Sequence, residues 1–255
     1  MKFTTIADAK RQTGLTSFGK VNNGAKHKKA YKYNEMVYTI YLAPAKLSGY
    51  EVCPGRSIGC TKACLNMSGM NTMSMRDEYI NKSRIKKTRL FMEQREFTVR
   101  WIMEEIKNAK KNALLKGMDF SIRLNNTSDI NPEEFYIMEG DSRLNLLEIF
   151  PNVNFYDYTK VPERIELLKK YPNYDLTFSY NGDNMNICKT MLENNVRVAM
   201  VFNKKVPNVF IGYNVIDADQ YDMRYKDPRN VIAGLKYKRV RNKLEISNTF
   251  IIHEK

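Results

Sequence analysis

The chain has 255 residues, a length that suits one large domain or one domain with short extensions. Hydrophobic residues make up 43% of it and charged residues 27%, which excludes intrinsic disorder over the whole chain. No stretch approaches the length of about 18 apolar residues that a membrane-spanning helix needs, so we expect no membrane partner. With 42 Lys and Arg against 28 Asp and Glu, the formal net charge is +14.

The first part of the chain predicts an arm, one strand and a loop. Residues 1–35 are polar and rich in Gly, Asn and Lys, and we expect them to form a basic N-terminal arm. Residues 36–43 are β-branched and aromatic, a composition typical of a strand. Residues 44–75 contain repeated Pro and Gly and predict an irregular loop. We expect residues 36–255 to form a single α/β domain that includes this loop.

A helical segment and a series of strand–helix units follow the loop. Residues 77–115 have apolar positions at helical spacing, and Gly117 is the expected stop. The later strands are predicted at 120–124, 153–159, 174–180, 196–202, 209–217 and 230–237. The later helices are predicted at 131–148, 162–170 and 184–194.

This alternation of strands and helices predicts an α/β fold with a mainly parallel sheet. We favour an incomplete parallel β/α barrel, and an open doubly wound sheet is the alternative. Both architectures place functional side chains just after the carboxyl ends of the strands. The polar residues that meet this criterion include Asn125, Asn126, Ser128, Asp129, Asp157, Lys160, Ser179 and Asn181, and a further group of Asp217, Asp219 and Asp222 lies near the last strands.

Three cysteines in the predicted loop give the sharpest chemical signal in the chain. Cys53, Cys60 and Cys64 have the spacing C-x6-C-x3-C, with glycines between them that let the backbone bend. Structural zinc sites usually need four ligands, whereas three thiolates suit a four-iron cluster that leaves one iron open. We therefore expect an iron–sulfur cluster, and the alternatives are zinc or thiols that are simply buried.

The position of these cysteines resembles that in radical S-adenosylmethionine enzymes, which carry three cysteines in the loop after the first strand of a partial β/α barrel. The resemblance implies an iron–sulfur cluster and S-adenosylmethionine as cofactors. It also implies that Asn125, Asn126 and Ser128 lie where that superfamily binds the methionine amino group. Ser179 and Asn181 would then reach the ribose and the carboxylate. The cysteine spacing of the superfamily is C-x3-C-x2-C, which differs from the spacing here.

A closer resemblance covers residues 36–237. It rests on several segments in one order, namely YTIYLAPAKLSGYEVCPGRSIGCTKACL, IRLNNTSDI, NFYDYTK, LTFSYNG and VIDADQYDMRYKDP. These segments resemble a bacteriophage protein family known as gene product eighty-eight, which has no assigned activity. The resemblance implies a phage origin and a shared fold. Together with clustered cysteines that form no disulfide framework, it leads us to expect the cytoplasm of an infected bacterial host.

Positive charge is concentrated in three segments of the chain. Residues 1–35 carry a net charge of +6, residues 81–101 carry +5 and residues 224–243 carry +7. Such segments suit a polyanion, because each phosphate that they neutralise releases counterions. The alternative is a solvated, lysine-rich surface. The side chains that we expect to contact nucleic acid are Lys86, Lys87, Arg89, Lys236, Lys238 and Arg239.

Two classes of function follow from these features. The first is a cluster-dependent enzyme that acts on a nucleic acid or a nucleotide, with Asp129, Asp157 and Lys160 as catalytic residues. The second is a non-enzymatic phage protein that binds nucleic acid or a host protein, in which the cysteines hold zinc or no metal.

Overall fold

The protein is described by a computed structural model over residues 1–64, 74–238 and 249–253. The strands of its central sheet are β1 (Gly19–Val21), β2 (Glu35–Ile40), β3 (Asp119–Arg123), β6 (Asn154–Thr159), β7 (Tyr174–Ser179), β8 (Val198–Phe202), β9 (Val209–Phe210), β10 (Tyr213–Asp217), β11 (Ile232–Lys236) and β12 (Ile251–Ile252). The α-helices are α1 (Ile6–Thr13), α2 (Ala25–Lys29), α3 (Ile58–Lys62), α4 (Ser74–Glu93), α5 (Arg95–Leu115), α6 (Leu146–Ile149), α7 (Leu167–Lys170) and α8 (Met185–Glu193). The short 3₁₀ helices are η1 (Ala30–Tyr33), η4 (Pro132–Glu134), η5 (Pro162–Glu166) and η6 (Arg224–Lys226).

The central sheet is mainly parallel, which confirms the predicted α/β class. β2, β3, β6, β7, β8 and β11 are hydrogen-bonded neighbours in the order in which the chain reaches them, and each pair is parallel. β10 extends the sheet beyond β11, while β1 and β9 pair antiparallel at its two ends. The carboxyl ends of the parallel strands therefore meet at one edge of the sheet, which we call the carboxyl edge.

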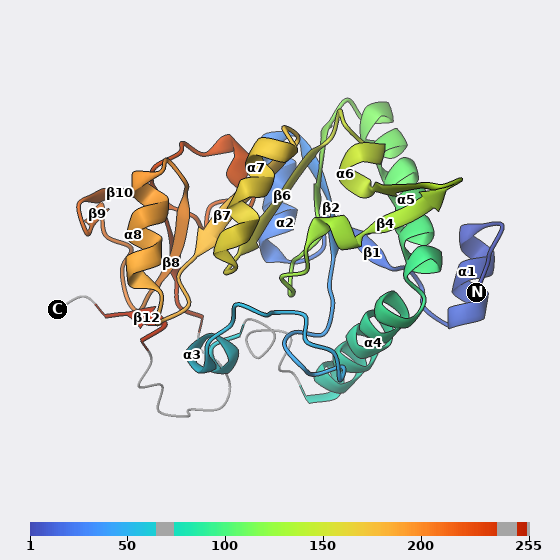
Figure 1. Ribbon diagram of the computed structural model, residues 1–255, viewed down its shortest axis with the longest axis horizontal. Coiled ribbons are helices and arrows are strands. Elements are labelled where there is room, and N and C mark those ends of the chain that lie inside the picture. Colours follow the sequence, from blue (N-terminus) through green and yellow to red (C-terminus); the bar gives the residue numbers. More distant parts are fainter. Residues whose placement is uncertain (65–73, 239–248, 254–255) are drawn as a thin grey trace.

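The two faces of the sheet have different coverings. Trp101 and Ile106 of α5 pack on the same core as Ile122 and Phe155 of the sheet. α6, α7 and α8 cover this face as well, which we call the helix-covered face. On the opposite face, η1 and residues 218–226 pack against the sheet, and α2 lies beside them (Figure 1).

Residues 1–35, which the sequence predicts as an arm, are folded into the domain. The rings of Phe3 and Phe97 meet edge to face, with centroids 5.1 Å apart. Glu105 of α5 accepts hydrogen bonds from the backbone N–H groups of Phe18 and Gly19 at 2.9 and 2.8 Å. β1 then pairs with β2. The apolar residues between the lysines supply contacts that hold this segment against α5 and the sheet.

Two predicted elements are each divided in the structure. The helical pattern over 77–115 is carried by α4 and α5, because Gln94 between them has the non-helical dihedral angles φ −134° and ψ 56°. The predicted strand 209–217 is divided into β9 and β10 by a turn at Ile211 and Gly212, both of which have positive φ. None of the helices in the described ranges is long and apolar enough to span a bilayer.

The predicted helix over 131–148 is wrong for most of its length. Asn131 and Pro132 start only the single turn of η4, and its Asn131 cap accepts a hydrogen bond from the Glu133 N–H. A hairpin of β4 (Tyr136–Glu139) and β5 (Ser142–Asn145) follows, and α6 comes after it. Gly140 at the hairpin turn has φ +60°, a left-handed conformation that glycine adopts without a steric penalty.

The C-terminal strand β12 enters the sheet at the carboxyl edge. β7 pairs with β8 only at Val198 and Ala199, whereas β12 pairs with β8 at Val201 and Phe202. The chain next to β12 also passes over Gly182, where an added Cβ would lie 2.9 Å from the Phe250 nitrogen. The end of the chain therefore lies at the same edge as the turns that carry the predicted site residues.

Candidate functional site

The cysteine loop lies across the carboxyl edge of the sheet. The Asp129 N–H donates to the Val52 carbonyl at 2.7 Å, and the Asn181 side chain donates to the Gly55 carbonyl at 3.1 Å. The Ser57 hydroxyl donates to the Asn181 carbonyl. The loop is thus tied to the turns that follow β3 and β7, and α3 within it lies along the lower edge of the molecule in Figure 1.

Gly55 brings the loop close to the end of β6. A Cβ at this position would lie 2.6 Å from the carbonyl oxygen of Lys160 and 2.7 Å from its carbonyl carbon. Because both atoms belong to the backbone, neither can move aside cheaply, and no larger residue fits without displacing the loop. The sequence predicts that this glycine lets the loop bend. In the structure it also allows the loop backbone to lie close to the end of β6.

The three loop cysteines are outside any disulfide and half-buried. The Cys53 Sγ lies 3.5 Å from the Ala45 N–H and 3.8 Å from the Thr127 carbonyl oxygen, to which it donates. Burial raises the pKa of the Cys53 thiol to about 12. Cys60 lies in the first turn of α3, where its N–H donates to the Ser57 hydroxyl at 3.0 Å. The fourth cysteine, Cys188, is buried in α8 and packs in the core.

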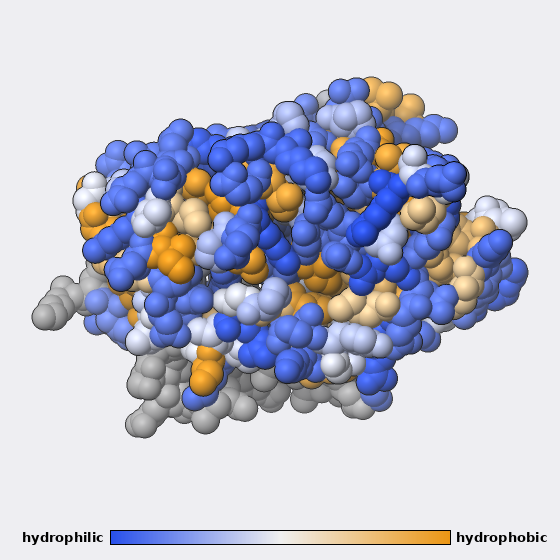
Figure 2. All heavy atoms as spheres, in the orientation of Figure 1, coloured by the Kyte–Doolittle hydropathy of each residue, from blue (hydrophilic) through white to orange (hydrophobic). Residues whose placement is uncertain are grey.

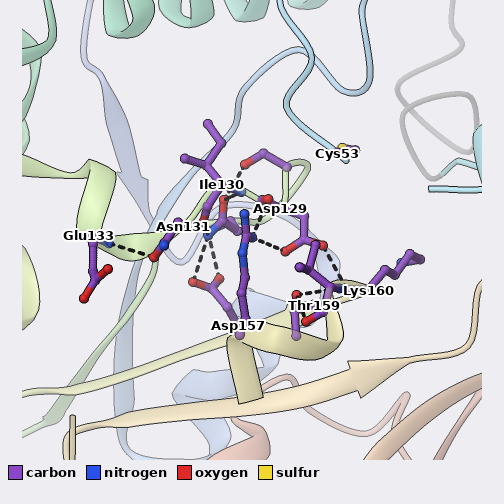
Figure 3. A network of polar contacts seen from close by, with 12 residues as sticks. Cys53, Asp129, Ile130, Asn131, Glu133, Asp157, Thr159 and Lys160 are labelled. Atoms are coloured by element: carbon purple, nitrogen blue, oxygen red, sulfur yellow. Dashed lines mark hydrogen bonds and ion pairs between the residues drawn. The ribbon is translucent and has the colours of Figure 1, made fainter. Parts of the chain in front are cut away.

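The Lys160 ammonium group interacts electrostatically with the three loop cysteines. Burial lowers the pKa of Lys160, but the charges of Cys60 and Asp129, followed by those of Cys53 and Cys64, outweigh burial and raise it overall. The ammonium forms no ion pair or hydrogen bond with any residue in the described part of the chain. Figure 3 shows the Lys160 side chain extending away from the Asp129 carboxylate. Buried charges in proteins are normally paired, so this ammonium is available to an anionic group.

Asp129 fixes the start of the turn after β6. Its carboxylate accepts a hydrogen bond from the Lys160 N–H at 2.8 Å and lies 2.5 Å from the Arg164 guanidinium (Figure 3). Arg164 also donates to the Asp129 carbonyl. The sequence predicts Asp129 to be catalytic, but its carboxylate is taken up by these contacts, and we assign it a positioning role. Arg164 is not among the site residues predicted from the sequence. Its position shortly after the end of a predicted strand is the sequence feature that indicates a place at this edge of the sheet.

Asn125 and Asp157 lie in the protein interior and hold the turn 125–130. The Asn125 backbone and side chain donate to the two Asp157 carboxylate oxygens at 2.8 and 3.2 Å. The Asn125 amide also bonds the Ser128 hydroxyl and both backbone groups of Ile130. Asp157 is on the helix-covered face, and burial raises its pKa to about 7. Asn125 and Ser128 are predicted from the sequence to bind a cofactor. In the structure their polar groups instead hydrogen-bond within the turn and hold it together.

The other predicted cofactor residues have separate surroundings. Asn126 is partly exposed, and its side-chain amide makes no hydrogen bond within the ranges that the structure describes, while its backbone N–H donates to the Ile40 carbonyl at 3.3 Å. Ser179 is buried at the end of β7, where its carbonyl accepts from Asn184 at 3.2 Å. The Asn181 amide holds Gly55, as described above. Of these residues, Asn126 thus combines partial exposure with a side-chain amide that holds no other part of the described chain.

The chain matches a family model described as Gene product 88 over residues 10–253. It belongs to the Gene product 88 family of bacteriophage proteins. This confirms the family resemblance drawn from the sequence. Comparisons with curated proteins and with solved structures find no match.

The predicted nucleic-acid residues of this Gene product 88 family member differ in exposure. Lys86, Arg89, Lys236 and Lys238 are exposed. Lys87 is only 6% exposed and donates to the Phe18 carbonyl at 2.6 Å, so its prediction as a phosphate contact is wrong. Burial lowers its pKa to about 8. Arg239 lies outside the described residues. The face of the molecule in Figure 2 is mainly hydrophilic, with hydrophobic residues in small groups.

Proposed function

We propose that the protein is an enzyme that holds an iron–sulfur cluster on Cys53, Cys60 and Cys64 and acts on a nucleotide or a nucleic acid. The observation that carries this proposal is the unpaired Lys160 ammonium and its electrostatic interaction with three thiols at the carboxyl edge. Thiolates are the usual ligands of such clusters, and a nearby cation would offset their negative charge.

The strand order supports the proposal. From β2 to β8 the parallel strands follow one another in the sheet as they do in the chain, and the order changes only at the far end, where β11 lies between β8 and the earlier strand β10. Such a progressive order is that of a β/α barrel or part of one, in which active sites lie at the carboxyl edge. The cysteine loop follows β2, the first strand of this series, as it does in the radical S-adenosylmethionine enzymes that the sequence resembles.

The three loop thiols are suitable ligands for a thiophilic metal, but the structure does not bring them together around one point. Within the described ranges, no three His, Cys, Asp or Glu side chains lie close enough together to hold a metal ion. The proposal therefore requires Cys60 and Cys64 to approach Cys53, which is itself held by Ala45 and Thr127. A bound cluster would supply electron transfer. The chain itself would contribute Lys160 to bind an anionic group and Asn126 to orient it.

Anaerobic expression and purification, with quantification of iron and acid-labile sulfide, tests the proposal. The wild-type protein should carry iron and absorb visible light, and Cys53→Ser, Cys60→Ser and Cys64→Ser should each lose most of the iron. Cys188→Ser is the matched control and should keep it. Iron-free wild-type protein after anaerobic reconstitution, or equal iron in all variants, would overturn the proposal.

The second candidate is a nucleic-acid-binding protein without cluster chemistry. It is favoured by the exposed Lys86 and Arg89 on α4 and by Lys236 and Lys238 near the end of β11. In this case the purified protein should contain stoichiometric zinc or no metal at the three thiols. It should nevertheless retain DNA or RNA on a filter at low salt.

A further inference from the structure

A second polar cluster lies on the opposite face of the sheet and has no part in the proposed thiol site. Thr39, Arg123 and Tyr158 come from the neighbouring strands β2, β3 and β6, and Thr39 and Arg123 are register partners. Ile122, Leu124 and Phe155 face the helices, so the residues that alternate with them face the other way. Parallel packing brings the three polar side chains together near the carboxyl edge.

Each of these side chains has a buried polar atom without a partner. The Arg123 Nε, the Tyr158 hydroxyl and the Thr39 hydroxyl make no hydrogen bond within the described residues. Such atoms are rare, because an unsatisfied buried donor costs about 1–3 kcal/mol. Three of them on one face of three adjacent strands indicate that a polar group belongs there. Arg123 Nε can only donate and both hydroxyls can donate, so the missing group is an acceptor.

The contacts of Arg123 fix the position of its guanidinium. One terminal nitrogen lies 2.5 Å from the Asp222 carboxylate, and the guanidinium carbon lies 4.7 Å from the centroid of the Tyr158 ring. The Arg123 side chain is 12% exposed, whereas that of Asp222 is 2% exposed. Tyr41 and Tyr158 are partly exposed beside it. Parts of Arg123, Tyr41 and Tyr158 thus reach the surface, whereas Arg123 Nε and the Tyr158 and Thr39 hydroxyls lie beneath it.

Several basic side chains lie around the cluster. His27 Nδ1 faces the Asn23 carbonyl at 2.8 Å and its Nε2 faces Asp222 at 3.1 Å. The Tyr41 hydroxyl also lies 3.2 Å from Nδ1. Arg123 and His27 thus both contact the single carboxylate of Asp222. The nearby Lys26 pairs with Asp219 at 3.4 Å, and the Arg84 guanidinium lies over the Tyr41 ring at 5.3 Å.

We propose that Arg123, Tyr158 and Thr39 form a binding site for a small oxyanion, such as the phosphate group of a nucleotide. The acceptor oxygens of the anion would satisfy Arg123 Nε and the two hydroxyls, and its charge would complement that of the Arg123 guanidinium. This site goes beyond the proposed function, because it needs neither a metal nor the thiols.

Calorimetric titration and thermal unfolding with inorganic phosphate, and separately with a nucleoside monophosphate, test this site. Phosphate should bind and raise the melting temperature of the full-length protein. Tyr158→Phe and Thr39→Val should each weaken binding about ten- to a hundredfold, as expected when one hydrogen bond to a charged group is removed. Tighter binding of the nucleotide than of phosphate would show that the anion belongs to a larger ligand.

Tyr136→Phe is the matched control, because this hydroxyl lies on the separate β4–β5 hairpin, and it should leave binding unchanged. Circular dichroism shows whether each variant is folded. Tyr158→Phe and Thr39→Val remove unsatisfied groups, so they should also leave the ligand-free protein at least as stable as the wild type. Failure to bind phosphate at millimolar concentration, or unchanged affinity in both variants, would overturn the site. Ordered water molecules on all three atoms in a crystal soaked in phosphate would do the same.

Discussion

The His27 Nε2 lies 3.1 Å from the Asp222 Oδ2, although 195 positions separate the two residues along the chain. The same carboxylate is 2.5 Å from Arg123 and 3.5 Å from the Tyr156 hydroxyl. It thereby joins the N-terminal segment, the central sheet and the segment after β10. Asp222 is buried, and the charges of Arg123 and His27 outweigh the effect of burial, so its pKa lies well below the ordinary value.

Asp222→Asn should therefore destabilise the protein strongly. Removal of one partner from a buried ion pair leaves an uncompensated charge and costs about 3–5 kcal/mol. The lowered pKa also means that the stability supplied by the carboxylate is present above about pH 4 and is lost as the pH falls below it. Urea unfolding at several pH values measures both effects. The exposed Asp141→Asn is the control, and an equal, small change in both variants would contradict the prediction.

Asp157 should have the opposite influence on stability. Burial raises its pKa to about 7 although Arg123 and Asn125 lower it, so the folded protein holds a proton that the unfolded chain releases near pH 4. The stability due to this group is thus full below about pH 4 and is lost as the pH rises through 7. The wild type should lose a few kcal/mol over this range relative to Asp157→Asn, in which the group does not titrate. If the free energy of unfolding changed with pH in the same way in both proteins, the prediction for Asp157 would be wrong.

Gly55→Ala tests the close approach of the cysteine loop to β6. The added methyl group meets the Lys160 backbone at 2.6 Å, and overpacking of this kind costs about 1–3 kcal/mol. We expect a lower melting temperature and faster alkylation of Cys53, because displacement of the loop exposes that thiol. Labelling of Cys188, which is buried in α8, should not change. If Cys53 in the variant were alkylated at the same rate as in the wild type, the loop would tolerate the methyl group and the prediction would be wrong.

The protein should bind nucleic acid through Lys86 and Arg89 and not directly through Lys87. The double variant Lys86→Glu, Arg89→Glu should lower the affinity and reduce the salt slope, by about 0.9 for each phosphate that the protein no longer neutralises. The double variant Lys110→Glu, Lys111→Glu makes the same charge change on the exposed side of α5 and should have a smaller effect. Filter binding measures this, and no retention of DNA or RNA by the wild type at about 50 mM salt would refute it.

The buried Lys87 should respond to substitution as a core residue. Its ammonium donates to the Phe18 carbonyl, and burial lowers its pKa to about 8. Lys87→Glu should unfold the protein or lower its melting temperature far more than Lys86→Glu, because it buries a carboxylate beside Glu105. Thermal unfolding followed by circular dichroism compares the two, and similar melting temperatures would contradict the burial of Lys87.

The sequence by itself determined the alternation of strands and helices and the position of the cysteine loop after the first parallel strand. Hydrophobic periodicity and the breakers Pro and Gly are local features, and β2, β3, β6, β7, β8 and β11 follow from them. The local pattern failed at 131–148, where helix-start signals at Asn131 and Pro132 support only one turn. The turn at Gly140 starts a hairpin instead.

Only the tertiary structure decided what each polar side chain can do. Asp157 and Tyr158 are neighbours in the chain, yet strand geometry turns Asp157 into the helix-covered core and Tyr158 toward the opposite face. Lys86 and Lys87 differ in the same way on α4. The partners Arg164 of Asp129 and His27 of Asp222 come from distant segments that strand order and packing bring together. A side chain's protonation and availability depend on such neighbours and on burial, and both are set by long-range contacts that no local pattern records.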